Sequence, residues 1–110
     1  MEKERRSAPR ARVNLPARWE GAASRENATV TDISRNGCFV LSGGKIGIKE
    51  LVWVEIKLSD RQTVQFWAEV VYEASEIGFA LRFNSSSPED AETLATFLEG
   101  VFQSQTNKNA

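Results

Sequence analysis

The sequence predicts a mainly β fold: a six-stranded antiparallel β-barrel, preceded by a flexible basic N-terminal arm and followed by a C-terminal α-helix. Six short segments rich in β-branched and aromatic residues follow one another with short turns between them. This pattern is typical of antiparallel pairing and of small barrels. Helical periodicity begins only after the sixth segment. A length of 110 residues suits a single domain with its own core.

Residues 1–12 are expected to form the arm. Five of them are basic and two are acidic, so this stretch carries +3, whereas the whole chain has a net charge of −1. Pro9 and the density of charge disfavour a helix here. Because the rest of the chain is acidic, a nucleic-acid-binding surface that is basic throughout is disfavoured, whereas a local anion site at the arm is not.

Alternation of apolar and polar residues predicts the strands. The first strand is expected from Val13 to Trp19, and Pro16 falls on its outward phase, as in an edge or early strand position. The same criterion predicts five further strands, at residues 28–31, 38–41, 51–58, 64–72 and 77–83.

Four residues of these strands invite a functional interpretation. Tyr72 shares its phase with the apolar residues before it in the longest strand, so it could belong to the core or face a ligand. Trp53 and Trp67 lie at strand spacing among apolar neighbours and are expected to serve packing. Cys38 is expected to be a small core residue, because the chain has no histidine to activate a thiol.

A helix should follow the last strand. Ser87 supplies a cap, Pro88 the first helical position, and two acidic residues the first turn. The barrel and helix are expected to span residues 13–103, and residues 104–110 to form a polar tail. The helix should either cover one rim of the barrel or pack on its outer face near the two tryptophans.

Composition argues against several classes of protein. The absence of histidine removes the commonest general base and metal ligand, and neither metal-ligand spacing nor a Gly-rich phosphate loop is present. We therefore expect no enzyme, metal or cofactor. No apolar run reaches the roughly 18 residues of a membrane span, no signal peptide is evident, and one cysteine cannot form an internal disulfide. These features predict a cytoplasmic protein.

The arginines of the arm are candidate ligand-binding residues: Arg5, Arg6, Arg10 and Arg12. A run of charge is usually a solvated tail, and this interpretation stays open. Guanidinium groups, however, make bidentate contacts with phosphate and stack on flat rings, which lysine does less well. Arg6 and Arg10, four residues apart, could close like a clamp on a flat ligand that carries phosphate.

The second candidate stretch is Asp32-Ile33-Ser34-Arg35-Asn36-Gly37. It can be explained as a turn in which Asp32 and Ser34 bond to local backbone N–H groups. The same residues could bind a ligand. Asp32 could accept hydrogen bonds from a guanine edge or an arginine, and Ser34 could donate to a phosphate. Gly37 permits positive φ or a close backbone approach.

Taken together, the two stretches resemble the PilZ domain, the bacterial receptor module for cyclic di-GMP. Residues 6–10 match its R-x-x-x-R motif and residues 32–37 its D/N-x-S-x-x-G motif, while residues 76–83 are similar to its glycine-bearing last strand. The order and spacing of the motifs make the combination more specific than either alone. The resemblance covers about residues 4–102 and implies a PilZ-like split barrel that binds cyclic di-GMP without catalysis.

The resemblance also implies roles for individual residues. Arg6 and Arg10 would grip guanine bases and phosphates from the arm, and Asp32, Ser34 and Gly37 would line the barrel surface beneath. Arg5 resembles the extra arginine of members that bind two stacked ligand molecules. Tyr72 falls near the position at which some members stack an aromatic ring on guanine.

Three functions remain in consideration. The first is a cyclic di-GMP receptor that alters the surface shown to an unidentified protein effector. The second is a PilZ-like adaptor for protein interaction with weak or no nucleotide binding. The third, disfavoured by the acidic body of the chain, is a barrel that binds single-stranded nucleic acid through the arm and exposed aromatic residues.

Overall fold

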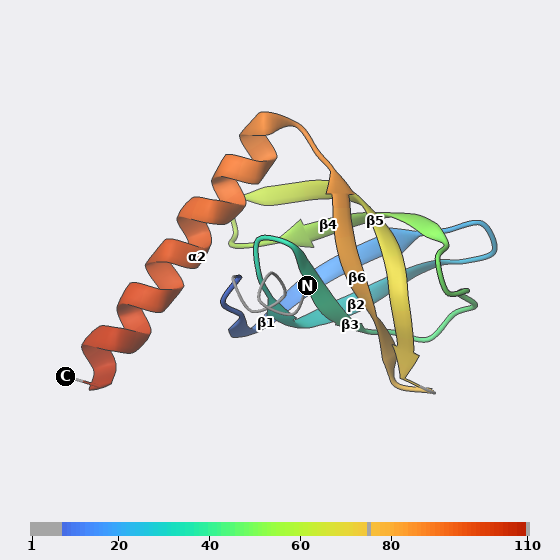
Figure 1. Cartoon of the computed structure of the whole chain (residues 1–110), viewed down its shortest axis with the longest axis horizontal. Helices are drawn as coiled ribbons and strands as arrows, with labels where there is room; N and C mark the ends of the chain where they lie inside the picture. The colour runs from blue at the N-terminus through green and yellow to red at the C-terminus, as the bar shows by residue number, and fades with distance from the viewer. Residues whose placement is uncertain (1–7, 75, 110) are drawn as a thin grey trace.

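A computed structural model describes residues 8–74 and 76–109 and shows a closed antiparallel barrel with one helix beside it (Figure 1). The predicted fold class is confirmed. Around the barrel the strands follow the order β1-β2-β3-β6-β5-β4, and β1 closes it by pairing with β4. The elements are β1 (Ala11–Glu20), β2 (Arg25–Ile33), β3 (Gly37–Leu41), β4 (Leu51–Lys57), β5 (Thr63–Ala74), β6 (Gly78–Ser85) and α2 (Pro88–Asn109).

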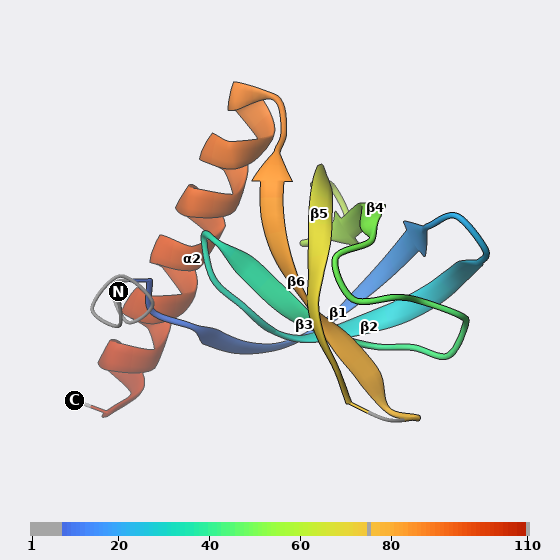
Figure 2. The same ribbon diagram turned by 45° about the vertical axis from the view of Figure 1, so that its right-hand side comes forward.

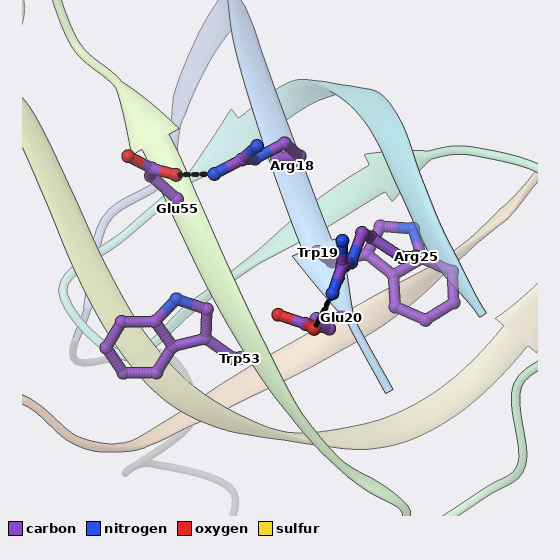
Figure 3. Close-up of a pocket in the computed structure, with 6 residues that line it drawn as sticks. All are labelled: Arg18, Trp19, Glu20, Arg25, Trp53 and Glu55. Atoms are coloured by element: carbon purple, nitrogen blue, oxygen red, sulfur yellow. Dashed lines mark hydrogen bonds and ion pairs between the residues drawn. The ribbon is translucent and has the colours of Figure 1, made fainter. Parts of the chain in front are cut away.

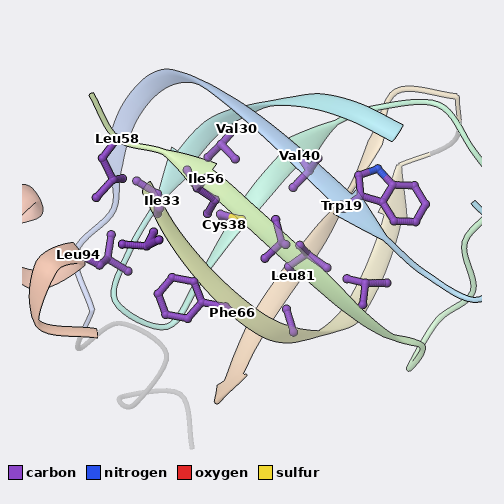
Figure 4. Close-up of a cluster of buried hydrophobic side chains, with 14 of the residues drawn as sticks. Trp19, Val30, Ile33, Cys38, Val40, Ile56, Leu58, Phe66, Leu81 and Leu94 are labelled. Carbon is purple, nitrogen blue, oxygen red and sulfur yellow. The ribbon is translucent and has the colours of Figure 1, made fainter. Parts of the chain in front are cut away.

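Strand alternation fills the barrel. The inward residues of the strands form one apolar cluster that includes Val30, Val40 and Ile56 (Figure 4). Trp19 packs its ring edge-on against Phe79, with centroids 5.2 Å apart, and its Nε1–H donates to Ser42 Oγ at 2.8 Å. The large indole is therefore buried without an unsatisfied donor.

The helix covers one end of this core. Leu94 and Leu98 of α2 are 1% and 3% exposed, and Leu94 lies at the same end of the cluster as Leu58 (Figure 4). Ser87 Oγ accepts the N–H of Asp90, and the Asp90 carboxylate accepts the N–H of Gln65 in β5. The cap predicted at Ser87 thus exists, and the first turn is fastened to the barrel. Of the two placements expected for the helix, the rim is the one adopted.

Two element boundaries differ from those predicted. β1 begins at Ala11, inside the stretch assigned to the arm, because Ala11 pairs with Ile33 of β2 and is buried. The helix runs on to Asn109, through residues 104–109 that were predicted to be a polar tail. This stretch has no glycine or proline to end a helix. The polarity of its side chains alone therefore did not predict where the helix ends. Pro16 lies before the first β1–β4 pair, where β1 pairs with β2 only.

β-Bulges break the alternation in two strands that matter for the site. In β2 the register shifts between Val30 and Asp32, and in β5 it shifts between Val70 and Tyr72. In each strand one extra residue turns the next side chain to the opposite face. Val70 is fully buried but Tyr72 is 55% exposed. The sequence pattern placed Tyr72 on the same face as Val70, and this assignment was wrong because of the bulge between them.

Candidate functional site

The turn between β2 and β3 is held by its own serine. Ser34 is 3% exposed; its hydroxyl accepts the Asn36 N–H at 3.0 Å and donates to the Gly37 carbonyl at 3.5 Å. The Ser34 N–H donates to the same carbonyl at 2.8 Å. The hydroxyl thus both accepts and donates a hydrogen bond inside the turn, so Ser34 stabilises the turn beneath the outer surface. The expectation that it donates to a phosphate stays a prediction.

Gly37 is needed for close packing of β3 on β6. A Cβ atom at this position would lie 2.1 Å from the carbonyl oxygen of Leu81, which is well inside van der Waals contact. The φ angle of Gly37 is not in the left-handed region. Of the two reasons considered for a glycine here, positive φ is wrong. A close backbone approach is present, but the approaching group is the β6 backbone, and the expected close approach of a ligand stays a prediction.

Arg10 and Asp32 join the two candidate stretches. Arg10 Nη1 donates to Asp32 Oδ1 at 2.5 Å, with side-chain exposures of 60% and 33%. Arg12 and Asp32 are also direct partners in the β1–β2 register. The bulge after Val30 is what turns Asp32 outward, whereas Ile33 beside it enters the core. A guanidinium and a carboxylate thus meet on the outer surface, at the base of the arm.

An aromatic shelf lies beside this ion pair. Asp32 pairs with Phe39, Phe39 with Ala80, and Ala80 with Tyr72, so these residues form one row across β2, β3, β6 and β5. The rings of Phe39 and Tyr72 lie 6.2 Å apart at 36°, and Ala80 between them in the row is 8% exposed. Of the two positions considered for Tyr72, the core is wrong, because its ring faces outward on the side of Asp32; its contact with a ligand stays a prediction. Phe39 and Tyr72 together form the aromatic shelf.

Phe39 was missed from the sequence, although a signal existed. Cys38 was expected in the core, and alternation then turns its neighbour Phe39 outward, two residues after the motif glycine. A large apolar side chain at an outward position next to a ligand motif was the clue.

A second ion pair lies in the row of paired residues that starts at Gly37 and crosses β3, β6 and β5. Gly37 pairs with Arg82 of β6, and Arg82 with Glu69 of β5. Arg82 donates to the Glu69 carboxylate. Arg82 thereby remains on the outer surface beside a position that has no side chain of its own.

Cys38 lies beneath the site in the core. Burial raises the pKa of the Cys38 thiol far above its usual range; the Asp32 carboxylate raises this pKa further, and Arg10 lowers it. The expected core role is confirmed by an exposure of 1%.

We expect Cys38 to react with iodoacetamide only when the barrel opens. At about pH 8, alkylation of the native chain should be at least about 100-fold slower than alkylation of the chain unfolded in urea, because the thiol is both buried and protonated. Mass spectrometry of the quenched reaction measures both rates. Equal rates would mean that β3 is not part of a closed barrel.

Arg5 and Arg6, which were predicted to bind the ligand, lie outside the described residues. Among the described site residues, the structure brings Arg10, Asp32 and Tyr72 to one outer surface and places Ser34 and Gly37 beneath it. The Arg10–Asp32 part of this surface lies where the β2–β3 turn and the start of β1 both approach α2 (Figure 2).

Among the described residues, one pocket of about 230 Å³ lies between β1 and β4 and is lined by Arg18, Glu20, Arg25, Trp53 and other residues (Figure 3). Over residues 8–74 and 76–109, no three His, Cys, Asp or Glu side chains are arranged to hold a metal ion. Nor does this part of the chain contain a helix long and apolar enough to cross a membrane.

Comparison with known proteins supports one family. Residues 4–100 match the family model described as the PilZ domain, and no curated protein matches the chain. A solved structure of the Bacillus subtilis inhibitor of motility (MotI/DgrA) superposes with a TM-score of 0.75 at 18% identity and covers 94% of this chain. This chain spans 53% of that protein, about half its length.

A second solved structure is similar along its whole length. The PilZ domain of CeSA from a cellulose-synthesizing bacterium superposes with a TM-score of 0.62 at 15% identity, covering 88% of this chain and 98% of its own. At these identities the two structures support the fold alone.

Proposed function

This chain belongs to the PilZ domain family, and on that premise we propose that it is a cytoplasmic receptor for cyclic di-GMP that acts by binding and not by catalysis. The observation that carries the proposal is the Arg10–Asp32 ion pair on the outer face, next to the aromatic shelf of Phe39 and Tyr72. A cyclic dinucleotide with two guanines presents the matching groups: two phosphates, flat rings, and N–H donors on the guanine edge.

The chemistry of each group suits one part of this ligand. Arg10 can bind a phosphate in bidentate fashion or stack on a base. Asp32 can accept the N–H donors of a guanine edge once it exchanges Arg10 for the ligand. The aromatic shelf offers a flat apolar surface for a base. Charge-assisted hydrogen bonds contribute about 1.5–3 kcal/mol each, so a few of them support roughly micromolar affinity.

The arm completes the proposed site. Arg5 and Arg6 precede Arg10 by a few residues, so they can reach the same ligand from above. With three arginines available, a stacked pair of ligand molecules is an admissible occupant. Binding would fix the arm against the barrel and so change the surface offered to a protein effector. MotI, one structural neighbour, is named as an inhibitor of motility, and the other neighbour comes from CeSA; the effector of this chain is not inferred from either.

Calorimetric titration tests the proposal. Cyclic di-GMP should bind with a dissociation constant in the micromolar range, while cyclic di-AMP, which has the same phosphates but another base edge, should bind at least about tenfold more weakly because Asp32 requires guanine donors. Absence of binding heat at about 50 µM protein would refute the receptor function.

The runner-up function, a PilZ-like adaptor without nucleotide, is favoured by one observation. Asp32 already satisfies Arg10 in the free chain, so the pair could serve as a structural tie. A folded wild-type chain that binds no cyclic di-GMP would favour the adaptor. Binding to a single-stranded oligonucleotide that weakens steeply with salt would favour the nucleic-acid alternative instead.

A further inference from the structure

A second surface lies on the outer face of β1, β4 and β5, away from Arg10. Trp53 and Trp67 are paired across β4 and β5, and their rings meet edge to face at 5.3 Å. Trp67 is 47% exposed and Leu51, also on β4, is 54% exposed. With Glu20 and Gly21, these three side chains line a shallow cavity of about 560 Å³. We call Leu51, Trp53 and Trp67 the tryptophan patch.

Three ion pairs surround the tryptophan patch. Arg18 Nη2 donates to Glu55 at 3.0 Å, Arg25 Nη2 donates to Glu20 at 2.8 Å, and Arg82 pairs with Glu69. The strand register places them around the tryptophans. Glu20 is the partner of Trp53 in β1, and Glu55 and Leu51 flank Trp53 along β4. Figure 3 shows two of the pairs beside Trp53.

This arrangement has the anatomy of a protein interface. An apolar aromatic centre with a charged rim is typical of interface cores and their borders, and tryptophan and arginine are the residues that most often dominate binding energy. The arginine side chains of the rim are 61–72% exposed. Trp67 and Leu51 are also large apolar side chains left open to solvent at the centre, a feature that marks interaction sites when such residues are contiguous.

We propose that the partner at this surface is a second copy of the chain, in a two-fold symmetric dimer. The rim carries three arginines and three glutamates, so a partner of one charge sign would face like charges on half of it. An identical rim related by a two-fold axis can oppose each arginine with a glutamate, while the two tryptophan patches cover one another. The tryptophan patch adjoins the ligand surface at the Arg82–Glu69 pair, but its apolar centre lies on β4 and β5 outside the Arg10–Asp32 row, so the inference does not depend on cyclic di-GMP binding.

Sedimentation equilibrium of the full chain, between about 1 µM and about 1 mM, tests the dimer. The weight-average mass of the wild-type chain should rise towards twice the monomer mass. Trp67→Glu should stay monomeric, because two carboxylates would then be buried at the centre of the interface. The matched control is Ile77→Glu in the β5–β6 turn, an exposed apolar residue of 57% exposure, which should dimerise like the wild type.

A charge exchange at the rim tests the dimer independently, in case Trp67→Glu fails to fold. Arg18→Glu should raise the dimer dissociation constant at least about tenfold, and adding Glu55→Arg should bring it back to within about threefold of wild type, because the pair is restored both within and between chains. A chain that is monomeric at every concentration overturns the proposal. A dimer whose dissociation constant is unchanged in Trp67→Glu and in Arg18→Glu overturns it as well.

Discussion

Arg10→Ala is expected to weaken cyclic di-GMP binding by about 10- to 100-fold, which corresponds to the loss of one charged contact of about 1.5–3 kcal/mol. The melting temperature should hardly change. Arg10 is 60% exposed in its side chain, and its one described ion pair is a surface contact with Asp32, worth at most about 1 kcal/mol. Binding is measured by calorimetric titration and stability by thermal unfolding of the same samples.

Two control variants show whether the effect is specific. Arg10→Lys keeps the charge but loses the planar fork, so it should recover only part of the affinity. Arg61→Ala removes an exposed arginine from the β4–β5 turn, on the opposite side of the closed barrel from the β2–β3 turn, and should bind as the wild type does. If Arg61→Ala weakened binding as much as Arg10→Ala, the attraction would be a general charge effect and the site assignment would be wrong.

Adding Asp32→Ala to the Arg10→Ala variant separates two roles of the Asp32 carboxylate. If Asp32 only holds Arg10, the double variant Arg10→Ala/Asp32→Ala should bind no worse than Arg10→Ala. If Asp32 also binds the guanine edge, the double variant should be weaker by about a further tenfold. The receptor mechanism requires the second result.

The fold was predictable because the barrel obeys the period-two alternation along most of its length. Trp19, Val54 and Phe79 lie within strands predicted from the sequence, and all three enter the core. Alternation fails where a strand carries an extra residue. The bulge that exposes Tyr72 cannot be recognised from residues 70–72, because all three are apolar or aromatic. Register depends on the partner strand, so it could not be deduced from β5 alone.

The candidate site was predictable as a set of residues but not as a set of roles. Ser34 and Gly37 were expected at the ligand, yet one shapes the turn and the other admits the Leu81 carbonyl. An adaptor that binds no nucleotide needs both for its fold. Their presence therefore does not separate a receptor from an adaptor, and that distinction depends on Arg10, Asp32 and the arm.

The structural role of Gly37 leads to the largest stability effect that we expect. Gly37→Ala places a Cβ atom 2.1 Å from the Leu81 carbonyl oxygen, and neither backbone can yield without separating β3 from β6, which are paired over five positions. Overpacking of this kind against a backbone should cost about 3 kcal/mol or more. The melting temperature should fall by more than about 10 °C, measured by circular dichroism without ligand.

Gly43→Ala is the matched control, because a Cβ atom there meets nothing within 4 Å and the φ of Gly43 is not left-handed. It should melt within about 2 °C of the wild type, or slightly higher, since alanine has less conformational entropy to lose than glycine. Loss of ligand binding in Gly37→Ala should then follow the loss of fold. A variant that kept its melting temperature but lost cyclic di-GMP binding would show that Gly37 acts at the ligand and that β6 does not restrict it.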